Sequence, residues 1–200
     1  EMCIRDSIWG ALLPSDVDIR IQARFNPQTC DASSAVLGSA GPSDYARDFV
    51  GAEFTNTWYP IALANKQAGV DLEPGTDDIG ITFNSDIDNN ENCLAGTNWY
   101  YGLDSNELGD IELLPVVLHE MGHGLGFISL VNLATGNQFL NRPDIYSSFL
   151  FDTQVGLRWN DMTSLQRQAS IINSGNVVWD GFAVTSASPL FLGGAPKMFV

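Results

Sequence analysis

LPVVLHEMGHGLGF (residues 114–127) is the stretch that decides the fold, and it contains both histidines of the 200-residue chain. Glu120 directly follows His119, and His123 lies four positions after His119. Apolar residues recur at steps of three and four, which predicts a buried helix. We expect the helix to start near residues 111–113, with Asp110 as N-cap and Pro115 in the first turn, where a missing N–H costs nothing. Residues four apart share a helix face, so the two imidazoles can reach one ion.

The pattern His-Glu-x-x-His is the signature of zinc hydrolases, and each residue type has a chemical reason. Zinc takes neutral imidazole nitrogens, keeps one position for water and lowers the pKa of that water to roughly 7. A neighbouring carboxylate takes the proton during attack on a carbonyl and passes it to the leaving amine. The sequence therefore predicts His119 and His123 as zinc ligands and Glu120 as general base, then acid. Two core histidines spaced by accident are the alternative.

HEMGHGLGF (residues 119–127) resembles the active-site helix of metzincin-type metallopeptidases, and Gly126 matches the glycine of that pattern. The common third His is replaced by Ser129, so the leishmanolysin-like branch, whose third His comes later, is the more similar one. The resemblance implies an α+β, zincin-like catalytic domain in which a twisted mixed sheet packs on the active-site helix. It also implies that the strand Ile79–Phe83, through Ile79, Ile81 and Phe83, is the sheet edge that binds an extended peptide substrate. Three further segments look similar to secreted bacterial proteases of this kind: residues 59–65, 83–85 and 179–181.

The third zinc ligand is not evident, because no His follows His123 and no Glu follows Glu120. The carboxylates downstream are Asp144, Asp152, Asp161 and Asp180, and aspartate can ligate zinc. Turn or cap positions explain three of them, so Asp152 is the weak candidate within the chain. We expect instead that the chain is truncated at its C-terminus and that the third ligand lies beyond residue 200. Residues 1–200 alone should then bind zinc weakly.

Composition limits the class of protein. Residues 8–200 suit one domain without repeats or a linker, whereas residues 1–7 read as a non-native, adapter-encoded leader. No apolar run is long enough to span a bilayer. The net charge of −15 repels phosphate backbones, so nucleic acid is not an expected partner. We expect a secreted monomer whose partners are protein or peptide substrates.

Two further features have an open interpretation. Cys30 and Cys93 are spaced to form a disulfide, and two buried free thiols are the alternative. The run Asp86–Asn92 is rich in ligand oxygens and could bind calcium. It lacks the glycine and distal glutamate of an EF-hand, so a solvated loop is the preferred interpretation.

Periodicity and end signals predict the other elements. The strands are expected at residues 17–25, 79–83 and 177–179, and the helices at residues 57–67, with Asn56 or Thr57 as cap, and 163–172. Residues 33–41 are small and glycine-rich, which indicates a turn or a short strand. The combined prediction is a zinc-dependent endopeptidase. The rival is a secreted binding or adhesion module that kept a zincin scaffold without activity, which the missing third ligand favours and the intact Glu120 opposes.

Overall fold

The computed structural model describes residues 9–104, 106–173, 175–193 and 196–198. The leader expected at residues 1–7 lies outside this part of the chain. The described residues form two compact units, each presented separately below. Unit 1 comprises residues 9–51 and 60–127, and unit 2 comprises residues 52–59 and those from 128 onward. The secondary structure is mixed α and β with small sheets, which confirms the expected α+β class.

A three-stranded sheet forms the centre of unit 1, in the order β1-β5-β2. Its strands are β1 (Ile21–Asn26), β2 (Gly38–Pro42) and β5 (Ile79–Asn84). β5 pairs in parallel with β1 and antiparallel with β2. β5 has the predicted position, but β1 starts at Ile21 rather than at residue 17. Ile21 pairs with Ile79, the first residue of β5, so the strand pairing starts there; the Arg20 carbonyl before it accepts from the Asp78 and Ile79 N–H groups at 2.8 and 3.1 Å.

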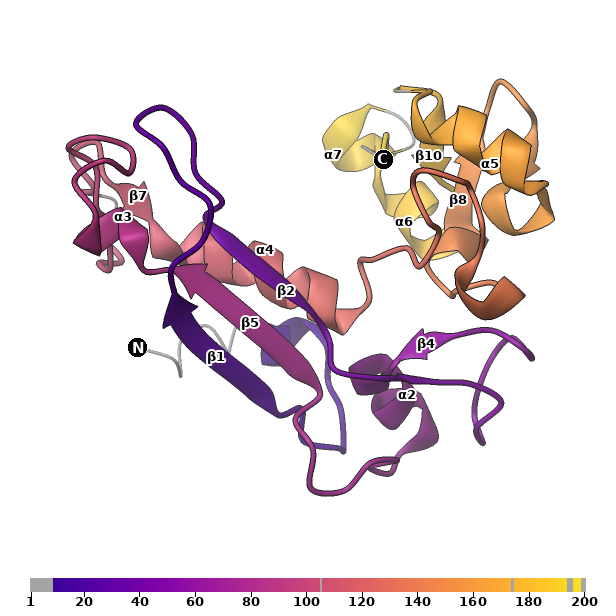
Figure 1. Ribbon diagram of the computed structural model, residues 1–200. Helices are drawn as coiled ribbons and strands as arrows, with labels where there is room; N and C mark the ends of the chain where they lie inside the picture. Colours follow the sequence, from indigo (N-terminus) through magenta and orange to yellow (C-terminus); the bar gives the residue numbers. More distant parts are fainter. Residues whose placement is uncertain (1–8, 105, 174, 194–195, 199–200) are drawn as a thin grey trace. The chain divides into compact units, whose positions relative to one another are not determined.

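The helix α4 (Leu113–Leu125) packs against β2 and β5 (Figure 1). Pro115 lies in its first turn as predicted, but the N-cap is Glu112 and not Asp110. Asp110 instead accepts a hydrogen bond from the Asn98 backbone N–H at 2.9 Å. The buried residues between α4 and the sheet form the core of this unit: Ala62, Ile79, Ile81, Phe83, Ile87, Cys93, Trp99, Leu113, Val117 and Met121.

Shorter elements complete unit 1. The remaining strands are β3 (Tyr45–Ala46), β4 (Tyr59–Pro60) at the boundary of the unit, β6 (Trp99–Tyr100) and β7 (Ile111–Glu112), and β6 pairs with β7 in parallel. The remaining helices are α2 (Ile61–Ala68) and α3 (Asp86–Asn89). α2 starts later than predicted because Pro60, and not Asn56 or Thr57, occupies the N-cap. It ends as predicted at Gly69, whose positive φ of 68° suits glycine.

A disulfide joins Cys30 to Cys93, which confirms the predicted pairing. The bridge ties the loop that follows β1 to the segment that leads toward α4. Cys93 is buried in the core of unit 1. A disulfide is typical of proteins from oxidising compartments, which agrees with the expectation of a secreted protein.

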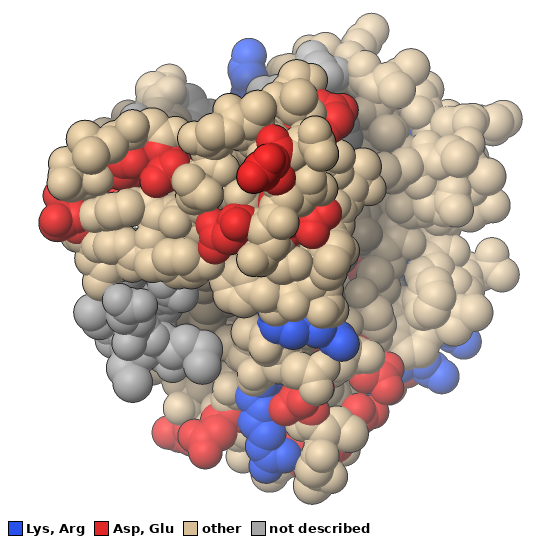
Figure 2. All heavy atoms as spheres, turned by 60° about the vertical axis from the view of Figure 1, so that its left-hand side comes forward, with Lys and Arg blue, Asp and Glu red and all other residues tan. Residues whose placement is uncertain are grey.

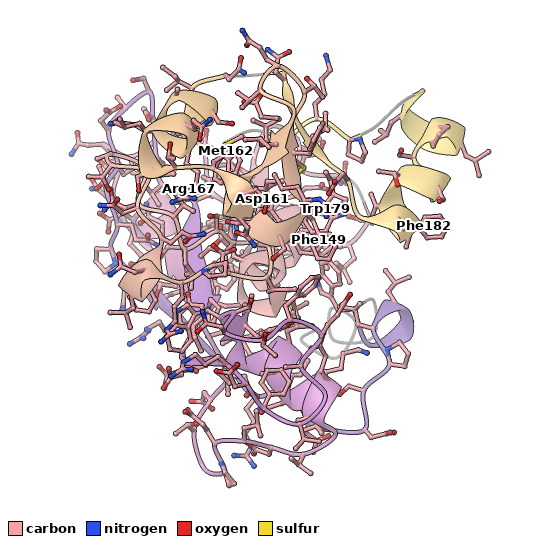
Figure 3. All side chains as sticks on the ribbon, turned by 90° about the vertical axis from the view of Figure 1, so that its right-hand side faces the viewer. Phe149, Asp161, Met162, Arg167, Trp179 and Phe182 are labelled. Carbon is pink, nitrogen blue, oxygen red and sulfur yellow. A yellow bond between two sulfur atoms is a disulfide. The ribbon has the colours of Figure 1, made fainter. Side chains whose placement is uncertain are left out.

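Unit 2 contains an antiparallel sheet in the order β10-β8-β9. Its elements are β8 (Leu150–Asp152), β9 (Leu157–Arg158), β10 (Val177–Trp179), α5 (Ser164–Ile171), α6 (Phe182–Ala187), α7 (Pro189–Leu192) and the 3-10 turns η1 (Phe139–Asn141), η2 (Ser147–Phe149) and η3 (Trp159–Asp161). Thr163 caps α5 as predicted, through a reciprocal capping box with Gln166. The rings of Phe149 and Trp179 stack with centroids 5.1 Å apart (Figure 3).

A buried arginine forms hydrogen bonds to the backbone of two turns in unit 2. Arg167 of α5 donates to the backbone carbonyls of Gly136, Trp159 and Met162, at 2.7, 2.9 and 2.5 Å (Figure 3). Burial lowers the pKa of this guanidinium. The carbonyl of Gly136 and two carbonyls of the turn from Trp159 to Met162 therefore converge on one side chain, which holds these two turns together.

The surface reflects the composition of the chain. On the face of unit 1 that carries α3 and β7, acidic side chains are prominent among the charged groups (Figure 2). The whole sequence has 24 Asp and Glu against 9 Lys and Arg, so anionic partners are repelled. Among the described residues, no helix has both the length and the apolar composition needed to cross a membrane.

Candidate metal centre

The two histidines of α4 point their imidazoles at the same place, as the spacing predicted. His119 Nε2 and His123 Nε2 are 3.1 Å apart, and the ring planes are nearly perpendicular at 88°. Two nitrogens that each lie about 2.0–2.1 Å from a tetrahedral zinc ion are about 3.3 Å apart. The observed separation therefore fits two ligands of one zinc ion. A direct hydrogen bond between the two neutral rings is the alternative at this distance.

The end of α4 determines which nitrogen of His123 is available. His123 Nδ1 lies 2.8 Å from the Phe127 backbone oxygen. A carbonyl can only accept, so Nδ1 carries the proton and Nε2 of the neutral ring keeps its lone pair. Gly126 makes this contact feasible because its φ of 124° ends the helix and turns the chain back. Gly126, the glycine of the motif, is thus needed for the backbone turn that brings the Phe127 carbonyl to His123.

Glu120 is buried, with 7% of its surface exposed, although its neighbour in sequence His119 is exposed. The side chain of Glu120 lies against β2, beside the backbone of Gly38. A buried carboxylate is a suitable general base where it can reach the reacting water. The role of Glu120 as general base stays a prediction, and sequence reasoning did not identify Gly38 as its neighbour.

The predicted substrate edge is wrong. Ile79, Ile81 and Phe83 belong to β5, which is the central strand and is hydrogen-bonded to β1 on one side and to β2 on the other. Their side chains are buried in the core. The edge position was implied by the family resemblance, whereas the order of strands in a sheet depends on long-range pairing that the residues of one strand do not determine.

The edge strand that lies against α4 is β2. The Leu37 carbonyl accepts a hydrogen bond from the Asn84 N–H of β5. In an antiparallel strand every second residue bonds to the partner strand through its backbone, so Ser39 and Gly41 follow Leu37 in bonding to β5. Gly38, Ala40 and Pro42 therefore direct their backbone groups to the open side of the sheet. Pro42 has no N–H to offer there. The glycine-rich segment of residues 33–41, for which the sequence indicates a turn or a short strand, thus contains the start of the open edge strand β2 beside Glu120.

The described residues contain no group of three or more His, Cys, Asp or Glu side chains that could together hold a metal ion. Asp152, the weak third-ligand candidate, is buried and accepts hydrogen bonds from Ser170 Oγ at 2.6 Å and from Asn173 Nδ2 at 3.0 Å. Its other oxygen accepts from the backbone N–H groups of Gln154 and Val155. Burial, the largest influence, raises the pKa of Asp152, but these hydrogen bonds together outweigh it and lower the pKa below its usual value. Asp152 therefore has a structural role in unit 2.

Two of the other downstream aspartates, Asp144 and Asp180, also have local partners. Asp144 is buried and accepts from the Leu130 and Ser147 backbone N–H groups at 3.0 and 2.7 Å, and burial raises its pKa. Asp180 forms an ion pair with Arg158 at 2.7 Å. Ser129, at the position of the common third His, lies 2.8 Å from Ser147 Oγ. The identity of the third zinc ligand stays a prediction.

The acidic run Asp86–Asn92 forms α3 and the loop after it. Asp88 accepts from the Trp99 N–H at 2.8 Å and from the Tyr101 hydroxyl at 2.6 Å. Burial and the neighbouring Asp88 raise the pKa of Tyr101 to about 12. Since Asp88 uses its oxygens on protein donors, it stabilises the β6 region. Calcium binding by this run stays a prediction.

No family model matches this sequence, and neither a curated protein nor a solved structure matches it.

Proposed function

We propose that the chain is a zinc-dependent peptidase domain, similar in its active-site helix to metzincins of the leishmanolysin-like branch. The observation that carries the proposal is the convergence of His119 Nε2 and His123 Nε2 at 3.1 Å. It is supported by the Nδ1 contact of His123 with Phe127, which orients one ring as hydrogen-bond partners of zinc-ligating histidines do. The small mixed sheet packed on α4 agrees with the zincin-like arrangement that the resemblance implies.

In this proposal each residue has a defined task. His119 and His123 would hold the ion, which, when bound, supplies Lewis acidity toward a carbonyl and lowers the pKa of water to roughly 7. Glu120 takes the proton of the attacking water and then donates it to the leaving amine. Burial of Glu120 keeps bulk water away from this transfer.

The substrate class follows from the open edge of β2. An extended peptide can pair with the backbone groups of Gly38 and Ala40, which lie on the edge beside Glu120. Main-chain pairing does not depend on side-chain identity, so we propose that the enzyme accepts peptides of varied sequence. Pro42 ends the run of paired groups on one side because it lacks an N–H.

The test combines metal binding with hydrolysis. Cobalt(II) titration followed by visible absorption should show binding by the wild-type chain that is lost in His119→Ala and in His123→Ala. Glu120→Gln should keep the metal and lose at least about 10²-fold in hydrolysis of a mixed peptide library, because general-base catalysis contributes that much. Full activity in Glu120→Gln, or unchanged cobalt binding in the histidine variants, would overturn the proposal. Metal binding without hydrolysis by the wild type would favour the inactive binding module.

A further inference from the structure

Gly38 occupies the point where the edge strand meets the candidate general base. It is the first residue of β2, and it pairs with Phe83 of β5. A methyl group built on Gly38 would lie 3.1 Å from Glu120 Cγ, 3.2 Å from Oε1 and 3.3 Å from Cδ. These separations are shorter than the 3.5–4.0 Å at which carbon atoms attract each other. The carboxylate of Glu120 therefore fills the space that a side chain at position 38 would need.

The backbone does not explain the glycine at this position. Gly38 is not among the residues with positive φ, so an L-residue can adopt its conformation without strain. Glycine within a strand weakens it, because glycine has no side chain to pack and loses more conformational freedom on folding. The space occupied by Glu120 is the remaining reason for the absent side chain.

The same strand contains a matched comparison. Gly41 lies three residues later in β2, and a methyl group built on it meets nothing within 4 Å. Its φ is also not positive. Alanine at position 41 thus makes the same chemical change in the same strand without touching Glu120.

We infer that Gly38 is a positioning residue, which sets the place of the Glu120 carboxylate by leaving it room against β2. This inference rests on the proposed function, in which Glu120 is the general base. Glu120 is buried, so its carboxylate has little free space in which to move aside. A displacement of about 1 Å from the productive geometry costs about 10²-fold in rate, and a few tenths of an ångström cost less.

The first experiment compares Gly38→Ala with Gly41→Ala in peptide hydrolysis. Gly38→Ala should lower kcat by about 10- to 100-fold and change KM less than twofold, because the edge groups that pair with substrate are kept. Gly41→Ala should keep both kcat and KM. Cobalt(II) affinity should be unchanged in both variants, which excludes damage to His119 and His123.

The second experiment needs no activity. In the metal-free protein, Gly38→Ala should have a Tm about 3 °C or more below that of Gly41→Ala, a size expected for a clash of this kind in a 200-residue chain. In a Glu120→Ala background the two alanine variants should unfold at the same Tm, because the clashing atoms are gone. A difference that persists in this background shows that Glu120 is not what Gly38 accommodates, and overturns the inference.

The outcomes separate the two claims. If the wild type hydrolyses peptides and Gly38→Ala matches Gly41→Ala in kcat, the inference is wrong and the proposed function stands. If the wild type and all variants lack activity, the proposed function fails. The Tm comparison then still decides whether position 38 and Glu120 share one space.

Discussion

Gly124→Ala tests whether α4 needs a residue without a side chain where it crosses the sheet. A methyl group at this position would lie 2.2 Å from Ile79 Cγ2 and 2.8 Å from Ile79 Cδ1. Ile79 is fully buried in the central strand and has no room to move. Overpacking a core costs about 1–3 kcal/mol, and so severe an overlap belongs at about 3. The better helix propensity of alanine returns about 1 kcal/mol, which leaves a net loss of about 2 kcal/mol.

Gly122→Ala is the matched control, because a methyl group there meets nothing within 4 Å. Only the propensity effect remains, so this variant should gain about 1 kcal/mol in free energy of unfolding. Urea unfolding followed by tryptophan fluorescence measures both, and equal m-values would show that the unfolding reaction is unchanged. The two variants should differ by about 3 kcal/mol. A Gly124→Ala protein as stable as the wild type would refute the close approach of α4 to β5.

Three further predictions concern other parts of the chain. Replacing Cys30 and Cys93 by serine opens a bridge with a sequence separation of 63, which should cost about 4 kcal/mol; the Tm should equal that of the reduced wild type, and an unchanged Tm on reduction would contradict it. Folding lowers the pKa of Asp152 below 3.8, so the ionised carboxylate stabilises the protein above that pH, and this contribution is lost as the pH falls through the lowered pKa. Asp152→Asn should therefore flatten the fall in Tm between pH 5 and 2, roughly the range in which such a group titrates. An unchanged slope of Tm against pH would count against this role. Thr163→Ala removes one half of the capping box with Gln166 and should cost about 1 kcal/mol in denaturant unfolding.

The sequence predicts best those features whose causes lie within a few residues. α4 ends at Gly126, whose positive φ suits glycine, and α5 starts after Thr163, which caps it through its neighbour Gln166. The candidate base and both imidazoles follow from one helical spacing. For these features the residues were already named from the sequence, and the structure adds the distances between their atoms.

Features that depend on distant partners could not be predicted in the same way. Asp110 is a residue type that favours helix N-caps, yet its carboxylate accepts a hydrogen bond from the Asn98 backbone N–H. The residues of β5 read as a strand, but only pairing with β1 and β2 makes that strand central and not an edge. Gly38 gives no local signal, because its neighbour Glu120 is more than eighty positions away in the chain.

In the proposed metal site, the contact between His123 Nδ1 and the Phe127 carbonyl would link ion uptake to the closing of a single helical turn. If the last turn of α4 frays, the ring is free to change tautomer and to rotate. Ligation selects the closed turn, and the closed turn presents a ready lone pair, so each should favour the other. Hydrogen exchange at the amides of Gly126 and Phe127 would then slow on loading with metal, and this segment would act as a local reporter of occupancy.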